Sequence, residues 1–266
     1  MPVARNIRFV TLFVVVLFAR ISASSLPNIS PQQNQTSQRY SRGIEAEVAR
    51  WSKQLKSAGQ EDRLEAALNL AHLEGSAATS SLASALTDSS ALVRAVALAG
   101  LANRPGTSVA PLIAVRLTSD KDPFVRKTAA YALGRFSGTE RTAALIAALK
   151  DKDLEVRGAA AVSLGDHADT DAVTPLVAAL SDKTAFVRAQ AARALGINTK
   201  GAAQATPPLI KLLTSDDDGD VKRHAATALG LIGEHSALPA LQTASHSSDS
   251  YLAQAARDAI AMIEAK

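Results

Sequence analysis

The stretch DDDGDVKRHAATALG, residues 216–230, concentrates the side chains of this chain that could do chemistry. Its first nine positions hold four aspartates, a lysine, an arginine and a histidine. Carboxylates and imidazoles can bind metal ions or transfer protons. A calcium loop needs acids at its first, third and fifth places and glycine at its sixth, but Gly219 is fourth and no glutamate closes the loop. The stretch does not match that pattern, and we predict no metal, cofactor or catalytic residue in it or elsewhere in the chain.

The second half of the stretch, AATALG, has near-copies along the chain, and these copies define an internal repeat. Five copies are centred on a valine, and two weaker copies have Asp62 and Leu252 at that place. The steps between the seven central residues are 31, 32, 31, 31, 34 and 31 residues. Such a period is typical of stacked repeat units. The central valines are Val93, Val125, Val156, Val187 and Val221.

Each copy predicts a helix pair. The central valine, the alanine four residues later and the leucine eight residues later share one face of a helix, as in Val125, Ala129 and Leu133. A shorter apolar stretch, such as residues 171–182, precedes it and predicts a first helix. A glycine after the leucine fits a helix end or close helix packing. Three residues before the central residue comes an expected N-cap: Ser90, Asp122, Asp153, Thr184, Asp218 or Asp249.

A pair of opposite charges recurs in the five full copies. An aspartate lies five residues before the valine, and an arginine or lysine follows the valine directly. Because the same residues occur in layer after layer, we expect a structural ladder along the stack and not a binding track. The ladder residues are Asp88, Arg94, Asp120, Arg126, Asp151, Arg157, Asp182, Arg188, Asp216 and Lys222.

The frames at residues 120–134 and 151–165 resemble HEAT repeats of the phycobilisome-lyase-like type. The resemblance covers about 220 residues from Ile44 onward. It implies an all-α fold, a right-handed α-solenoid of about seven stacked helix pairs whose second helices line a concave face. The family includes scaffolds, adaptors, bilin lyases and a hydroxylase, so the resemblance does not select one activity.

Two enzymatic relatives provide the alternative to a scaffold. Deoxyhypusine hydroxylase binds iron through His-Glu pairs near the starts of its second helices. None of the four matching places here holds His-Glu: they are Lys127-Thr128, Gly158-Ala159, Ala189-Gln190 and Arg223-His224. Bilin lyases act on cytoplasmic or plastid substrates, which an export signal argues against. We therefore predict a protein without enzymatic activity, with a divergent hydroxylase-like or lyase-like enzyme as the alternative.

The N-terminal region predicts export. Residues 1–23 have the pattern of a signal peptide, with Arg5 and Arg8 before an 11-residue apolar run that is too short to span a bilayer comfortably. An uncleaved anchor is the alternative. Residues 24–42 are rich in Ser, Gln and Pro and predict a flexible linker, and residues 43–266 form the solenoid. We expect a protein in the bacterial periplasm or secreted, without membrane contact after cleavage.

The net charge argues against a nucleic-acid partner. Without the three arginines of residues 1–23, the formal charge falls from +4 to +1, which gives no general case for nucleic-acid binding. The chain has no cysteine. We expect a monomer that binds a protein or peptide through second-helix positions that vary between repeats. These candidates form a mildly basic stripe suited to an acidic partner: Lys127, Tyr131, Arg135, Gln190, Arg193, Arg223 and His224.

Overall fold

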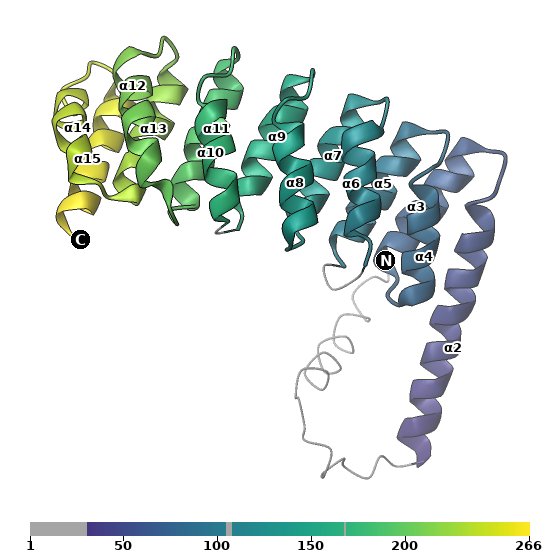
Figure 1. The fold of residues 1–266 in the computed structure, drawn as a ribbon. Helices are drawn as coiled ribbons and strands as arrows, with labels where there is room; N and C mark the ends of the chain where they lie inside the picture. Colours follow the sequence, from purple (N-terminus) through teal and green to yellow (C-terminus); the bar gives the residue numbers. More distant parts are fainter. Residues whose placement is uncertain (1–30, 105–107, 168) are drawn as a thin grey trace. The chain divides into compact units, whose positions relative to one another are not determined.

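A computed structural model of the chain describes residues 31–104, 108–167 and 169–266 (Figure 1). The chain divides into two units, residues 1–46 and 47–266. The predicted signal peptide lies outside the described residues. In the first unit, the described part is the beginning of a single helix. The second unit contains the repeats.

Helix α2 (Pro31–Gln54) begins earlier than the sequence predicted. Residues 31–42, expected to belong to a flexible linker, are helical, while residues 24–30 of that linker lie outside the described residues. Glutamine counted toward disorder in the prediction, but glutamine is a good helix former. Proline is well tolerated in the first helical turn, and neither glycine nor proline occurs in residues 32–42.

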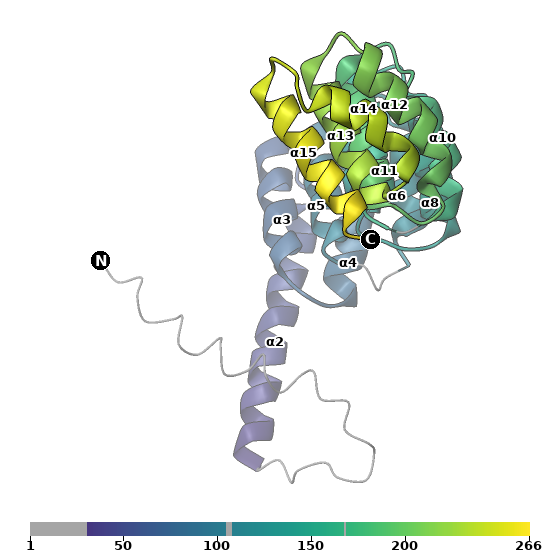
Figure 2. The same cartoon turned by 90° about the vertical axis from the view of Figure 1, so that its left-hand side faces the viewer.

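The repeats are helix pairs, as predicted. In the described residues, 14 α-helices stack in sequential pairs, which Figures 1 and 2 show as successive layers. The first helices after α2 are α4 (Ser76–Ala85), α6 (Ala110–Ser119), α8 (Thr139–Ala148), α10 (Val173–Ala179), α12 (Thr206–Ser215) and α14 (Leu238–Ala244). The second helices are α3 (Gln60–His72), α5 (Ala91–Ala102), α7 (Pro123–Leu133), α9 (Leu154–Gly165), α11 (Ala185–Ile197), α13 (Gly219–Ile232) and α15 (Ser250–Glu264).

The core lies between these layers and consists of small aliphatic side chains. Val125, Ala129 and Leu133 of α7 are fully buried, as predicted from their spacing on one helix face. The corresponding residues of α9, α11 and α13 are fully buried as well. Because each layer covers the apolar face of its neighbour, the stability of the repeats depends on the interfaces between them.

The glycine after the recurrent leucine serves close packing and not a left-handed helix end. A Cβ atom built on Gly165 would lie 2.8 Å from Cα of Ala194 in the next second helix. At Gly230 the corresponding distance to Cα of Ala259 is 2.6 Å. Neither glycine has a positive φ angle. Both positions therefore need glycine because two helix backbones approach closely there.

The predicted N-caps occupy the expected positions at the starts of the second helices. Asp122, Asp153, Asp218 and Asp249 each accept hydrogen bonds from backbone amides of the first turn. The hydroxyl of Thr184 instead donates to Asp182, 2.7 Å away, and Ser90 stands at the N-cap without a capping bond from its side chain. The four aspartate caps fix where α7, α9, α13 and α15 begin, and so they place the charged residues of the adjoining turns.

Candidate partner-binding face

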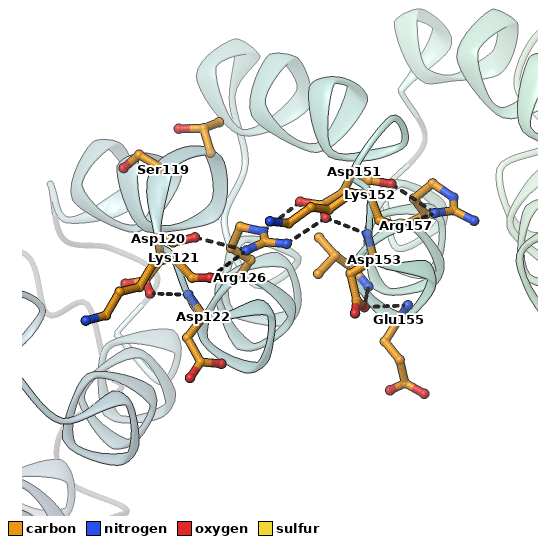
Figure 3. Close-up of polar contacts among 12 residues, drawn as sticks. Ser119, Asp120, Lys121, Asp122, Arg126, Asp151, Lys152, Asp153, Glu155 and Arg157 are labelled. Atoms are coloured by element: carbon orange, nitrogen blue, oxygen red, sulfur yellow. Dashed lines mark hydrogen bonds and ion pairs between the residues drawn. The ribbon is translucent and has the colours of Figure 1, made fainter.

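An arginine–aspartate ladder crosses the joints between neighbouring repeats near the starts of the second helices. Nε and Nη2 of Arg126 donate to the two carboxylate oxygens of Asp151 in the next repeat, at 2.7 and 2.8 Å (Figure 3). Nη1 donates to the backbone carbonyl of Asp120, 3.0 Å away. Two-bond pairs of the same form are Arg63–Asp88, Arg94–Asp120, Arg157–Asp182 and Arg188–Asp216.

The direction of the pairing could not be seen in the sequence. Each of these arginines bonds the carboxylate of the following repeat. Of the aspartate six residues before them, Arg94, Arg126, Arg157 and Arg188 bond only the backbone carbonyl. Arg63 was missed because Asp62 replaces the valine of its copy, although the arginine keeps its place in the frame. At the other end, Lys222 makes no ion pair among the described residues. Ser247 stands where the next ladder aspartate would be.

The ladder pairs are shielded from solvent and stay ionised. The side chains of Arg94 and Asp120 are 5% and 3% exposed. Burial alone would raise the pKa of Asp182, but hydrogen bonds from Arg157 and Thr184 outweigh it and lower this pKa to about 2. The pKa of Arg157 is raised by its bond to Asp182. Each of the five joints from α3–α5 to α11–α13 therefore contains a charged two-bond contact at neutral pH.

Five of the predicted partner-binding residues differ in how far they are exposed. Tyr131, Arg135 and Arg193 are exposed on α7, just after α7, and on α11. Gln190 and His224 are half-buried. The first three can contact a partner without any rearrangement of the repeats.

The other two predicted residues connect neighbouring repeats. Nζ of Lys127 lies 2.8 Å from a carboxylate oxygen of Glu155 in the next repeat. Arg223 pairs with Asp249 of the next repeat at 2.9 Å and also contacts Asp220 of its own helix. Both cations are partly neutralised inside the protein. They are therefore less available to an acidic partner than Arg135 and Arg193.

Exposed apolar side chains gather on one face of the second helices, which the sequence analysis largely missed. We define the second-helix face as the positions one before, six after and ten after each central residue, which share one side of a helix. Among the described residues, 12 large hydrophobic side chains are exposed, and nine of them lie on this face. These nine are Leu68, Leu92, Phe124, Tyr131, Phe186, Ile197, Leu231, Tyr251 and Met262. The available signal was the aromatic residue directly before the central residue in PFVR, AFVR and SYLA.

At the fourth repeat an aromatic ring of the next repeat covers the small residues at the start of α9. A Cβ atom on Gly158 would lie 2.2 Å from Cε1 of Phe186, so the ring of Phe186 lies over this glycine. Gly158 and Ala159 are buried. Phe186 itself is 41% exposed and is the surface that a partner would meet at this joint.

At the opposite end of the second helices, cations contact helix carbonyls. Arg104 donates to the carbonyl of Leu70 at 2.9 Å, and Nζ of Lys266 lies 2.8 Å from the carbonyl of Leu231. Arg141 is buried and donates to the carbonyl of Ser163. Burial lowers the pKa of Arg141. Cations in these places complement the negative end of the helix dipole and satisfy free carbonyl groups.

Two further findings concern the described residues only. No three His, Asp or Glu side chains there come together as ligands for a metal ion. No helix of this part of the chain is long and apolar enough to cross a membrane.

Comparison with known families matches the model for HEAT repeats at residues 48–134, 79–149, 142–200 and 175–261. These matches cover most of the chain and agree with the period, the helix pairs and the buried Val-Ala-Leu face described above. The chain belongs to the HEAT-repeat family. No curated protein matches it.

Solved structures with the same fold include three that cover most of this chain. The Escherichia coli protein YibA is 23% identical with a TM-score of 0.62, over 91% of this chain and 90% of YibA. The complex of CpcE and CpcF of phycocyanin lyase from a Nostoc species is 21% identical with a TM-score of 0.51, over 93% and 98%. An engineered protein is 27% identical with a TM-score of 0.52, over 84% and 68%. These similarities establish the fold and leave the activity open.

Proposed function

We propose that this protein is a non-enzymatic HEAT-repeat scaffold that binds a protein or peptide along its second-helix face. The observation that carries the proposal is the concentration of exposed apolar side chains there, nine of 12 in the described residues. Exposed apolar side chains that gather on one face of a protein commonly mark an interaction site. Aromatic residues such as Phe124, Tyr131 and Phe186 are also the types enriched at protein interfaces.

The charge of the middle repeats suggests an acidic partner. Arg135 and Arg193 are exposed on the second-helix side, and neither makes an ion pair among the described residues. Both lie near the exposed aromatic residues of their own repeats, Tyr131 and Phe186. An acidic segment with apolar side chains would match this combination, because charge complementarity steers binding while apolar contacts supply affinity.

Site-specific cross-linking tests the face. A benzoylphenylalanine placed at Tyr131 reports on the second-helix face, and the same group at the exposed Leu112 of α6 is the control on a first helix. In native extract we expect a discrete adduct from position 131 and none from position 112. Adducts of equal yield from both positions, or none from position 131, would contradict the proposal. Stoichiometric iron in protein purified without added metal would support the enzyme alternative instead.

Export is the second part of the proposal and rests on the pattern of residues 1–23. Mass spectrometry of the protein isolated from its native source measures the mature N-terminus. We expect a chain that begins close to residue 24 in an exported fraction. An intact N-terminus in the membrane fraction would favour the anchor alternative.

A further inference from the structure

Three residues of the stretch 216–230 that are not part of the recurring frame line a groove, while a fourth, Asp217, lies outside it. A groove of about 480 Å³ lies between α13 and α15, and Asp220, Arg223 and His224 line its α13 side. On the α15 side it is lined by Tyr251 and Met262, among others. Tyr251 is 77% exposed, the most exposed large hydrophobic side chain in the described residues. The side chains of Asp220, Arg223 and His224, which do not recur in the frame, therefore coincide with a surface cavity.

The groove exists because of the residue two positions after the central valine. In α9 this residue is Gly158, and Phe186 of the next helix lies over it. In α13 it is Arg223, whose guanidinium extends to Asp220 and Asp249. Because a long side chain occupies this place in α13, the ring of Tyr251 cannot pack over α13 as the ring of Phe186 packs over Gly158.

The charges around the groove sum to a negative value. Its acidic lining residues are Asp220 and Asp258 and its guanidinium is that of Arg223, so the lining carries one net negative charge. Asp249, outside the lining, pairs with Arg223, and Arg193 lies close enough to act on His224. Burial lowers the pKa of His224; the charge of Asp220 opposes this, and Arg193 and Arg223 add to it. The imidazole therefore adds little positive charge at neutral pH. The side chain of Asp220 is 71% exposed, so it can accept a second cation.

We propose that this groove binds a lysine or arginine side chain of a peptide, together with an aliphatic neighbour on that peptide. The cation lies between the carboxylates of Asp220 and Asp258, where the ring of Tyr251 adds a cation–π contact. The aliphatic neighbour packs on Tyr251 and Met262. This inference deepens the proposed function: it rests on partner binding along the second-helix face and assigns a basic group to its C-terminal end.

The methionine content of the chain provides a specific probe. The sequence has two methionines, Met1 and Met262. In full-length protein carrying ¹³C-methyl methionine, one of two methyl signals therefore reports on the groove. The ligands are the capped tripeptides Leu-Lys-Leu and Leu-norleucine-Leu, which differ in the lysine ammonium group.

We expect Leu-Lys-Leu to shift the Met262 methyl signal saturably, and to bind at least about fivefold more tightly than the norleucine peptide. The double variant Asp220→Asn/Asp258→Asn should weaken lysine-peptide binding about tenfold and leave norleucine-peptide binding unchanged. Asp217→Asn/Glu264→Gln is the matched control, since it removes two exposed acids outside the groove and should bind like wild type. Thermal melts confirm that both variants are folded.

Three outcomes would overturn the inference: an unmoved Met262 signal, equal affinities for the two peptides, or wild-type affinity in the Asp220→Asn/Asp258→Asn variant. The two proposals can fail separately. Adducts from position 131 together with an unchanged Met262 signal would contradict only the proposal that the groove binds a basic side chain. A shifted Met262 signal without adducts from position 131 would contradict partner binding along the second-helix face and would leave the groove as an isolated peptide site.

Discussion

The joint between α9 and α11 and the joint between α13 and α15 have the same close helix packing, but they differ in their ion pairs and in their outer surfaces. In both, a glycine near the end of one second helix lies against an alanine of the next: Gly165 against Ala194, and Gly230 against Ala259. The two residues after the central valine are Arg157 and Gly158 in the first joint, and Lys222 and Arg223 in the second. The first joint has a buried two-bond ion pair and a covered surface, and the second has a groove.

This difference shows that stacking and surface properties depend on different residues of a repeat. The spacing of the helices is set by buried aliphatic residues and by the glycine–alanine contact, which is the same in both joints. The residues directly after the valine decide whether the joint is held by a charged pair and whether its outer surface is flat. A repeat can therefore change its surface without changing its stacking.

Removing the ladder carboxylate should have the largest effect. Asp182→Ala leaves the guanidinium of Arg157, only 6% exposed, without its carboxylate, and should lower the free energy of unfolding by about 3–5 kcal/mol. Ser247→Ala at the equivalent place of the other joint should change it by less than about 0.5 kcal/mol. Urea unfolding of the full chain measures both. Equal losses would show that the ladder pair does not distinguish the joints.

Two glycines of α9, Gly165 and Gly158, should differ in how much stability is lost when each is replaced by alanine, and this difference should be smaller than that for the ladder. Gly165→Ala brings a methyl group against the backbone of Ala194 and should cost about 1–3 kcal/mol. Gly158→Ala meets only the ring of Phe186, which is free to turn toward solvent, and alanine favours the helix. We expect a change within about 1 kcal/mol for this variant. The same urea experiment ranks the two, and a larger loss for Gly158→Ala would contradict the packing account.

The pH dependence of stability tests the ladder charges. The folded-state pKa of Asp182 is about 2, below its ordinary value, so its contribution is present above about pH 4 and is lost as the pH falls through about 2. The pKa values of Asp88, Asp120, Asp151 and Asp216 are lowered too, because hydrogen bonds from arginine and backbone amides outweigh burial.

The stability gap between wild type and Asp182→Asn should therefore shrink between pH 5 and pH 2, to less than about half its value at pH 7. Unfolding experiments at several pH values follow the gap. A gap that stays constant over this range would mean that the carboxylate charge of Asp182 contributes nothing to stability.

Restoring the ladder at the last joint should have the smallest effect. Lys222→Arg and Ser247→Asp should each change stability by less than about 0.5 kcal/mol. The double variant can form the two-bond pair of the other joints and should gain about 0.5–1.5 kcal/mol beyond the sum of the single changes. A double-mutant cycle measures this coupling. Zero coupling would mean that more than these two residues distinguishes the joints.

Periodicity predicted most of the fold, because helix pairing, caps and the buried Val-Ala-Leu face repeat along the chain. The partner of Arg126 could not be predicted, since its own aspartate and that of the next repeat are equivalent in sequence and only the stacking selects one. The helix over residues 31–42 was missed because its glutamines suit both a linker and a helix. Phe186 was missed because variable positions were sought only after the central valine.

One binding measurement tests the proposed function most directly. It compares the affinity of the partner captured from position 131 for wild type, for Arg135→Glu/Arg193→Glu, and for Lys150→Glu/Lys211→Glu. The lysines of the last variant are exposed and lie just after α8 and on α12, so it makes the same charge change among the first helices. We predict at least about tenfold weaker binding by the arginine variant and unchanged binding by the lysine variant. Equal affinities of the two variants would contradict binding along the second-helix face.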